Sequence, residues 1–277
     1  EDTLVLWEGQ YGDFVNGAQA IIDEFIVSGQ AKWGMLSGLV VLLPHAWEGQ
    51  GPDHSSGRLE RFLELAAEDN LRIANCTTAA QYFHLLRRQA ASLRTQPRPL
   101  IVFTPKSLLR HAFSAARAIE LAEGTFRTVM DDPRGAGRAD RVRRVAFCSG
   151  KVWADVESDP NRAADEGLAL VRVEELYPFP TDGIRAVLRQ YRNARDVIWL
   201  QEEPRNAGAW RFVEPRLRAI IGPDQALRYV GRPERASPAE GWSDVHAVEQ
   251  RRIIDAVLER SARPTESFEP SRTTVSS

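Results

Sequence analysis

Short apolar runs alternate with amphipathic stretches along most of the chain. The apolar runs occupy residues 4–7, 39–43, 71–75, 100–103, 145–147, 168–173 and 197–200. Continuous runs of this length are typical of parallel strands that are buried on both faces, and the stretches between them are typical of connecting helices. The pattern therefore predicts an α/β fold, with mostly parallel sheets and helices on both faces.

The connecting stretches carry apolar residues at helical spacing. Helices are predicted over residues 18–26, 59–66, 78–86, 184–191 and 253–258. In the first of them the apolar positions follow i, i+3, i+4, i+7 and i+8, and Ser28-Gly29 is expected to end it. Thr78 with Gln81 three residues later has the capping-box pattern, and Thr181 is expected to cap the fourth helix.

A charged, glycine-containing segment over residues 127–140 interrupts this alternation, which resumes after it. We therefore predict two α/β domains, over residues 1–126 and 141–262, with residues 127–140 as the linker. Residues 263–277 are polar, contain proline and lack periodicity, which predicts a disordered tail.

Composition narrows the classes of protein to consider. Hydrophobic residues make up 43% and charged residues 27% of the chain, the profile of a soluble globular protein. Basic and acidic residues are interleaved, so we expect no nucleic-acid partner. No apolar run approaches the roughly 20 residues of a membrane span, so we expect no membrane partner. Cys76 and Cys148 follow apolar runs outside any Cys-x-x-Cys pattern, and we expect buried thiols of a reducing compartment.

The sequence starts at Glu1 without an initiator methionine, and an apolar run follows almost at once. We expect it to begin inside a domain. Any targeting signal would then lie upstream.

The most informative loop runs from Pro44 to Ser56, between a predicted strand and a predicted helix. Ligands of α/β sheets bind at the carboxyl ends of strands. His45 and His54 lie in this loop with carboxylates, an amide and hydroxyls, between glycines and prolines that suit the positioning of a substrate. The residues alone equally allow histidines that only hydrogen-bond their own loop.

A second loop follows the first predicted strand and leads into the first predicted helix. Its rings at Tyr11 and Phe14 can stack on a flat heterocycle, although aromatic residues more often anchor a core. In the second half, Glu202 and Glu203 follow a predicted strand. Paired carboxylates can transfer protons, but a solvated or interface role is the more common one.

Several other sites are not supported by the motifs. Neither a Gly-x-Gly-x-x-Gly fingerprint nor a P-loop occurs, so a nucleotide site has no basis. The spacing of His45 and His54 matches no zinc pattern, and we expect no metal ligands among the site residues. His54-Ser55 beside Asp53 cannot converge as a hydrolase triad, because the three residues are adjacent in sequence.

Longer motifs resemble a known enzyme family. They are Leu4 to Phe14, Pro44 to Ser56, Tyr82 to Arg88, Thr104 to Arg110, Gln201 to Pro204, Gly208 to Trp210 and Tyr229 to Ala239. Over about residues 1–260 the chain resembles the C-terminal part of the decarboxylating, thiamine-diphosphate-dependent first component of 2-oxoglutarate dehydrogenase.

The resemblance implies two transketolase-like domains, a partial pyrimidine-binding domain and a C-terminal domain. It implies an oxidoreductase of the tricarboxylic acid cycle that decarboxylates 2-oxoglutarate and passes the succinyl group to a lipoyl carrier. The implied partners are the dihydrolipoyl succinyltransferase of a multienzyme complex and a second copy in a homodimer. The implied compartment is the cytoplasm, or the mitochondrial matrix in a eukaryote. The ligands of the diphosphate and Mg²⁺ are expected upstream, as is the glutamate that activates the aminopyrimidine, so this segment alone should be inactive.

The resemblance also implies roles for individual residues. His54 would be the active-site imidazole that donates or accepts protons, and His45 a supporting or substrate-binding group. Gln10, Tyr11 and Phe14 would pack around the aminopyrimidine ring, with Tyr11 stacking on it. A further departure and two alternatives remain. Ala46 stands where the family usually has glycine, which restricts a positive φ there. The residues that choose between 2-oxoglutarate and 2-oxoadipate are expected upstream. The chain can also be a β-subunit-like chain of another 2-oxoacid dehydrogenase, or a non-catalytic assembly module.

Overall fold

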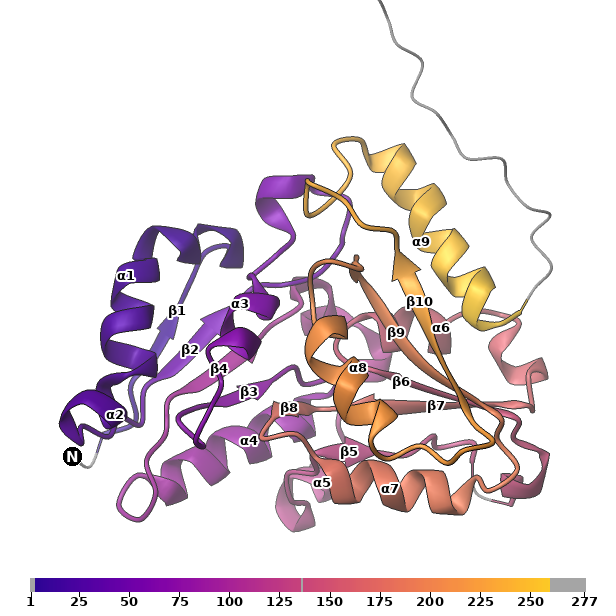
Figure 1. The fold of residues 1–277 in the computed structure, drawn as a ribbon, viewed down its shortest axis with the longest axis horizontal. Coiled ribbons are helices and arrows are strands. Elements are labelled where there is room, and N and C mark those ends of the chain that lie inside the picture. The colour runs from indigo at the N-terminus through magenta and orange to yellow at the C-terminus, as the bar shows by residue number, and fades with distance from the viewer. Residues whose placement is uncertain (1–2, 136, 260–277) are drawn as a thin grey trace, which may run out of the picture.

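The computed structural model describes residues 3–135 and 137–259, so the tail predicted over 263–277 lies outside the described residues. In this part the chain forms two five-stranded sheets that lie next to each other, with helices on both faces (Figure 1). The predicted α/β class with mostly parallel sheets is therefore confirmed.

The first sheet is parallel except at one edge. Its strands, in order across the sheet, are β1 (Leu6–Glu8), β2 (Val40–Leu43), β4 (Leu100–Phe103), β3 (Arg72–Ala74) and β8 (Glu175–Tyr177). All residues of β2 and β4 are buried, as expected from their unbroken apolar runs. The last strand, β8, comes from the second half of the chain and pairs antiparallel with β3, so it joins the two halves.

The second sheet has the same mixture. Its strands are β10 (Ala226–Arg232), β9 (Asp196–Pro204), β6 (Arg144–Cys148), β7 (Leu168–Val173) and β5 (Val129–Met130). The predicted strand over 168–173 is confirmed in full, whereas β5, β8 and β10 were not predicted. The strands β5 and β8 are too short to contain a long apolar run, and β10 mixes exposed with buried residues.

Most predicted helices form, and the first does not. The helices are α1 (Gln19–Ile21), α2 (Gly29–Trp33), α3 (Leu59–Glu64), α4 (Ala79–Ser92), α5 (Ala118–Glu123), α6 (Val152–Glu157), α7 (Thr181–Gln190), α8 (Trp210–Arg218) and α9 (Ser243–Val257). The helix predicted over 18–26 is instead the single turn of α1 followed by a π-helical turn at Ile22–Val27, and Ser28-Gly29 leads into α2. The π turn shifts the phase of the apolar stripe. Ile21 and Phe25 are exposed.

Two predicted caps have different outcomes. The Thr78 hydroxyl accepts the Gln81 amide at 3.3 Å, as predicted for the start of α4. The Gln81 side chain does not complete the capping box, because it donates to the Arg127 carbonyl and ties α4 to the linker. The cap predicted at Thr181 is wrong: α7 begins at this residue, and Pro180 precedes it without a side-chain cap.

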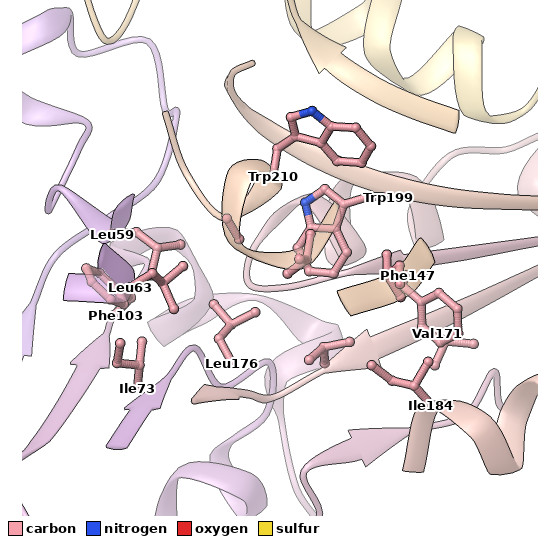
Figure 2. Close-up of a cluster of buried hydrophobic side chains, with 14 of the residues drawn as sticks. Leu59, Leu63, Ile73, Phe103, Phe147, Val171, Leu176, Ile184, Trp199 and Trp210 are labelled. Atoms are coloured by element: carbon pink, nitrogen blue, oxygen red, sulfur yellow. The ribbon is translucent and has the colours of Figure 1, made fainter. Parts of the chain in front are cut away.

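A continuous core joins the two sheets (Figure 2). It contains Leu59 and Leu63 of α3, Ile73 and Phe103 of the first sheet, Leu176 of β8, Phe147, Val171 and Trp199 of the second sheet, and Trp210 of α8. Alternate residues of the strands face away from it, under α4 on the first sheet and under α6 and α9 on the second. The two free cysteines, Cys76 and Cys148, are buried as predicted.

Large apolar side chains are exposed over the first 36 residues. They are Val5, Leu6, Trp7, Phe14, Ile21, Phe25, Trp33, Met35 and Leu36. Exposed large apolar side chains that gather in one segment are typical of an interface with another domain or chain. Within the described residues, no helix has the length and apolar character that crossing a membrane requires.

Candidate active site

The two predicted loops meet at the carboxyl ends of β1 and β2. The Gly12 amide donates to the Pro44 carbonyl at 3.1 Å. An added Cβ on Gly12 would lie 2.4 Å from that carbonyl oxygen and 2.7 Å from the Gly57 Cα, so only glycine permits this approach. The buried Asp13 then accepts the Ser56 amide at 3.1 Å through its Oδ1.

His45 lies inside the junction of the two domains. Its side chain is 2% exposed, and its ring packs edge-on against Trp47 and Phe103. Nδ1 accepts the Gly57 amide at 2.9 Å, and Nε2 lies 3.0 Å from Glu203 Oε1. Because a backbone N–H can only donate, Nδ1 keeps its lone pair and the ring proton is on Nε2, facing the carboxylate.

Two influences on the charge of His45 oppose each other. Burial lowers its pKa, but the hydrogen bond and charge of Glu203, with the charge of Glu202, outweigh burial and raise it. The Gly57 amide resists protonation, because a doubly protonated ring would turn a second donor toward it. The neutral ring with its proton on Nε2 satisfies both neighbours, and its two nitrogens are then fully used.

His54 has a different environment at the other end of the same loop. It is half-buried, and its ring lies edge-on to Tyr11, with centroids 4.3 Å apart, and to Phe14 at 6.0 Å. Neither ring nitrogen has a hydrogen-bond partner among residues 3–135 and 137–259. This imidazole can therefore exchange a proton with a bound molecule.

A lysine orders the aromatic residues beside His54. Lys106, which follows β4, places Nζ 3.6 Å from the centre of the Tyr11 ring and donates to the Gln10 carbonyl at 2.7 Å. Phe14 is 57% exposed, so it is not the core anchor that aromatic residues more often are. Tyr11, Phe14 and His54 form one partly exposed aromatic cluster, and Gln10 adjoins it with an exposed side chain.

The second domain holds the first half of the loop through two carboxylates. Glu202 and Glu203 are 5% and 6% exposed, so the solvated role considered for them is wrong. Glu202 accepts the Trp47 amide at 3.3 Å and pairs with Lys151 at 3.0 Å. Burial raises the pKa of Glu202, and the charge of Lys151 works against that rise.

Side chains farther along the loop are also held. The Trp47 indole donates to the Pro238 carbonyl at 2.9 Å, and Glu48 accepts the Ser107 amide at 2.9 Å. Ala46, which replaces the usual glycine of the resembled family, is not among the residues with positive φ. It therefore introduces no strain, and its amide donates to the Ser55 carbonyl at 3.0 Å.

Sequence reasoning did not assign roles to Asp13, Lys106 or the contact of Glu203 with His45. A charged residue in a loop at a strand's carboxyl end was the available signal for the first two. No sequence signal relates Glu203 to His45, because 158 positions separate them.

The cluster of Tyr11, Phe14 and His54 fits an aromatic heterocycle, because it offers ring faces and edges next to a free imidazole. The part of the chain that the structure describes contains no group of three or more His, Cys, Asp or Glu side chains arranged to hold a metal. A cavity of about 450 Å³ lies elsewhere, at the junction of α4, α5 and α6, and none of the predicted site residues lines it.

Both halves of the chain match known protein families. Residues 1–112 match the model of the transketolase pyrimidine-binding domain, and residues 115–258 match that of the 2-oxoglutarate dehydrogenase C-terminal region. The 2-oxoglutarate dehydrogenase E1 component of Geobacillus kaustophilus is 52% identical over 259 residues, covering 93% of this chain and 27% of that protein. The Bacillus subtilis E1 component is 49% identical over 262 residues, covering 94% of this chain and 28% of its own length. The chain therefore belongs to the family of 2-oxoglutarate dehydrogenase E1 components and spans little more than a quarter of the length of these relatives.

Proposed function

We propose that this chain supplies part of the active site of an enzyme that decarboxylates 2-oxoglutarate oxidatively and transfers the succinyl group to a lipoyl carrier. The proposal rests on the family, whose curated relatives carry the name of that enzyme's E1 component. It concerns the longer protein, because the chain matches 27% of the first of these relatives.

The observation that carries the chemical assignment is the half-buried His54 imidazole beside Tyr11. A general acid or base must reach the reacting atoms with a free nitrogen, and His54 has one whereas His45 uses both of its own. We assign to His54 the transfer of a proton at the 2-oxo oxygen of the substrate. His45 is assigned a supporting role, with no direct contact to the substrate.

Thiamine diphosphate is the cofactor that this proposal requires. When bound, it supplies the nucleophilic carbon and the electron sink that decarboxylation needs. Tyr11 and Phe14 would hold its aminopyrimidine ring, and Gln10 would border it. Ligands for Mg²⁺ and the diphosphate would come from outside residues 1–277.

We propose a second copy of the chain and a dihydrolipoyl succinyltransferase as partners in a cytoplasmic complex. The exposed apolar side chains of the first 36 residues support an assembly contact, although they do not select its partner. A purely non-catalytic assembly module is the competing interpretation. The free His54 imidazole in an aromatic cluster favours the catalytic one.

The test is a His54→Ala substitution in a full-length E1 component that carries this segment, assayed with 2-oxoglutarate, thiamine diphosphate and Mg²⁺. We expect kcat to fall about 100-fold or more, because the proton transfer is lost, while the Kd of thiamine diphosphate changes little. His84→Gln is the control, since His84 packs on α5 and its replacement keeps a donor for the Glu120 carbonyl. An unchanged kcat for the His54 variant would favour the assembly module.

A further inference from the structure

The contact between Glu203 and His45 links the second domain to the loop that carries His54. Glu203 lies at the carboxyl end of β9, and His45 directly follows β2 in the other sheet. Their atoms Oε1 and Nε2 are 3.0 Å apart, and both side chains are buried. No other contact of His45 within the described residues provides an acceptor for the Nε2 proton.

The neighbouring carboxylate, Glu202, has different partners from Glu203. Glu202 is neutralised by Lys151 and also accepts from Gln250 at 3.2 Å. Glu203 has no lysine or arginine partner in residues 3–135 and 137–259, and in this part of the chain the His45 imidazole is the only hydrogen-bond partner of its carboxylate. Gly208 packs against the Glu203 side chain, because an added Cβ there would lie 2.8 Å from it. The carboxylate is therefore held against His45 by packing.

The other nitrogen of His45 carries the constraint to the end of the loop. Nδ1 accepts from the amide of Gly57, three residues after His54. The two residues between are held as well, since Ser55 accepts the Ala46 amide at 3.0 Å and Ser56 donates to Asp13. If His45 changed tautomer, Nδ1–H would face Gly57 N–H, and the hydrogen bond between Gly57 and His45 would be lost.

We propose that Glu203 is a positioning residue of the active site, which together with the Gly57 amide fixes His45 as its Nε2–H tautomer so that the loop holds the His54 imidazole in place. The interpretation rests on the proposed role of His54. It makes the geometry of a histidine in the first domain depend on a carboxylate of the second. The site then depends on the contact between the two domains, because the hydrogen-bonded series Glu203, His45, Gly57 crosses between them.

The test compares Glu203→Gln with Glu203→Leu. A glutamine oxygen can still accept from Nε2–H, so His45 should keep its tautomer, whereas leucine offers no acceptor. We expect the imidazole nitrogen chemical shifts of His45, measured by NMR on this chain, to show protonated Nε2 in the wild type and in Glu203→Gln. In Glu203→Leu only the Gly57 amide still favours the Nε2–H tautomer, so we expect the share of His45 rings with protonated Nδ1 to rise.

The kinetic arm uses the same substitutions in a full-length E1 component. We expect kcat to fall about 10-fold or more for Glu203→Leu and much less for Glu203→Gln, with the Kd of thiamine diphosphate unchanged in both. Glu175→Gln is the control for removing a buried carboxylate, since Glu175 of β8 pairs with Arg88 of α4 and not with a histidine. It should leave the tautomer of His45 unchanged.

Two results would overturn the proposal. One is a wild-type spectrum in which His45 carries its proton on Nδ1, which needs no variant to fold. The other is a Glu203→Leu enzyme with wild-type kcat. Failure of the proposed function looks different, because a fully active His54→Ala enzyme would remove the catalytic role while leaving the tautomer result on His45 intact.

Discussion

The loop from Pro44 to Ser56 has a histidine near each end, and the two histidines have different environments. His45, where the loop leaves β2, is 3% exposed and hydrogen-bonded through both nitrogens. His54, nine residues later, is half-buried and has free nitrogens against an aromatic ring. The two histidines belong to the same short loop, so their position along the chain does not explain the difference. They differ because other elements cover only the first end.

The difference indicates how a catalytic loop at a strand's carboxyl end is made both stable and reactive. The first end contacts the second domain through Glu202, Glu203 and Pro238. Around His54 the contacts come from the first domain, mainly from Tyr11 and Phe14. Stability should therefore depend on the first end of the loop and activity on the second.

The largest expected effect is the difference in stability between the His45→Ala and His54→Ala variants. His45→Ala leaves the Glu203 carboxylate and the Gly57 amide buried without partners, so we expect the free energy of unfolding to fall by about 3 kcal/mol. His54→Ala removes a half-exposed ring without hydrogen bonds and should lower it by less than about 1 kcal/mol. Urea denaturation of this chain measures both values. Equal losses would contradict the division between the two ends.

The sequence predicted the loop but could not predict this division. The apolar run at 39–43 placed both histidines at the carboxyl end of a buried strand, and the strand forms at Val40–Leu43. Which histidine is covered depends on residues far along the chain, such as Glu203, and local patterns carry no information about such contacts. The same limit explains β8, whose three residues pair with β3 across a separation that periodicity cannot detect. Central, fully apolar strands were predictable because a strand buried on both faces has a continuous apolar run in its own sequence.

The second prediction concerns Gly12, which touches both ends of the loop. Gly12→Ala would place Cβ against the Pro44 carbonyl and the Gly57 Cα, and backbone atoms at 2.4 and 2.7 Å cannot yield without moving a strand end. We expect a loss of about 2 kcal/mol in the free energy of unfolding. Gly17→Ala is the control, because its Cβ would meet nothing within 4 Å. A Gly12→Ala chain as stable as this control would mean that the two loops separate easily.

The third prediction uses pH to test the contacts at the first end of the loop, near His45. Arg232 pairs with Glu240 at 2.7 Å in the segment whose Pro238 holds Trp47. Burial alone would raise the pKa of Glu240, but His246, whose Nδ1 lies 3.9 Å from its Oε2, and the hydrogen bond from Arg232 lower it to about 2. A depressed pKa means that the carboxylate stabilises the fold above its ordinary pKa of about 4.5 and that this contribution is lost as the pH falls toward 2.

Glu240→Gln should therefore be less stable than the wild type by about 1 to 2 kcal/mol near neutral pH, allowing for partial exposure of the pair. The difference should shrink below about pH 4.5 in urea denaturation series at decreasing pH. Glu249→Gln is the control, because its ion pair with Arg252 on α9 is more exposed and should contribute less than about 0.5 kcal/mol. A difference that stays constant as the pH falls would exclude ionisation of Glu240 as its cause.

The smallest expected effect acts on the other end, through Lys106. Its Nζ lies 3.6 Å from the centre of the Tyr11 ring, and Tyr11 in turn contacts His54. Lys106→Met keeps the length of the side chain but removes the cation and the bond to Gln10, so we expect a loss of about 0.5 kcal/mol. The imidazole NMR signals of His54 should shift, because Tyr11 is no longer held, while those of His45 stay in place. Lys32→Met is the control, since Lys32 on α2 lies 5.2 Å from the Trp33 ring and pairs with Glu24, without a contact to His45 or His54 among the described residues. Larger shifts at His45 than at His54 would show that the two ends are coupled more strongly than their contacts indicate.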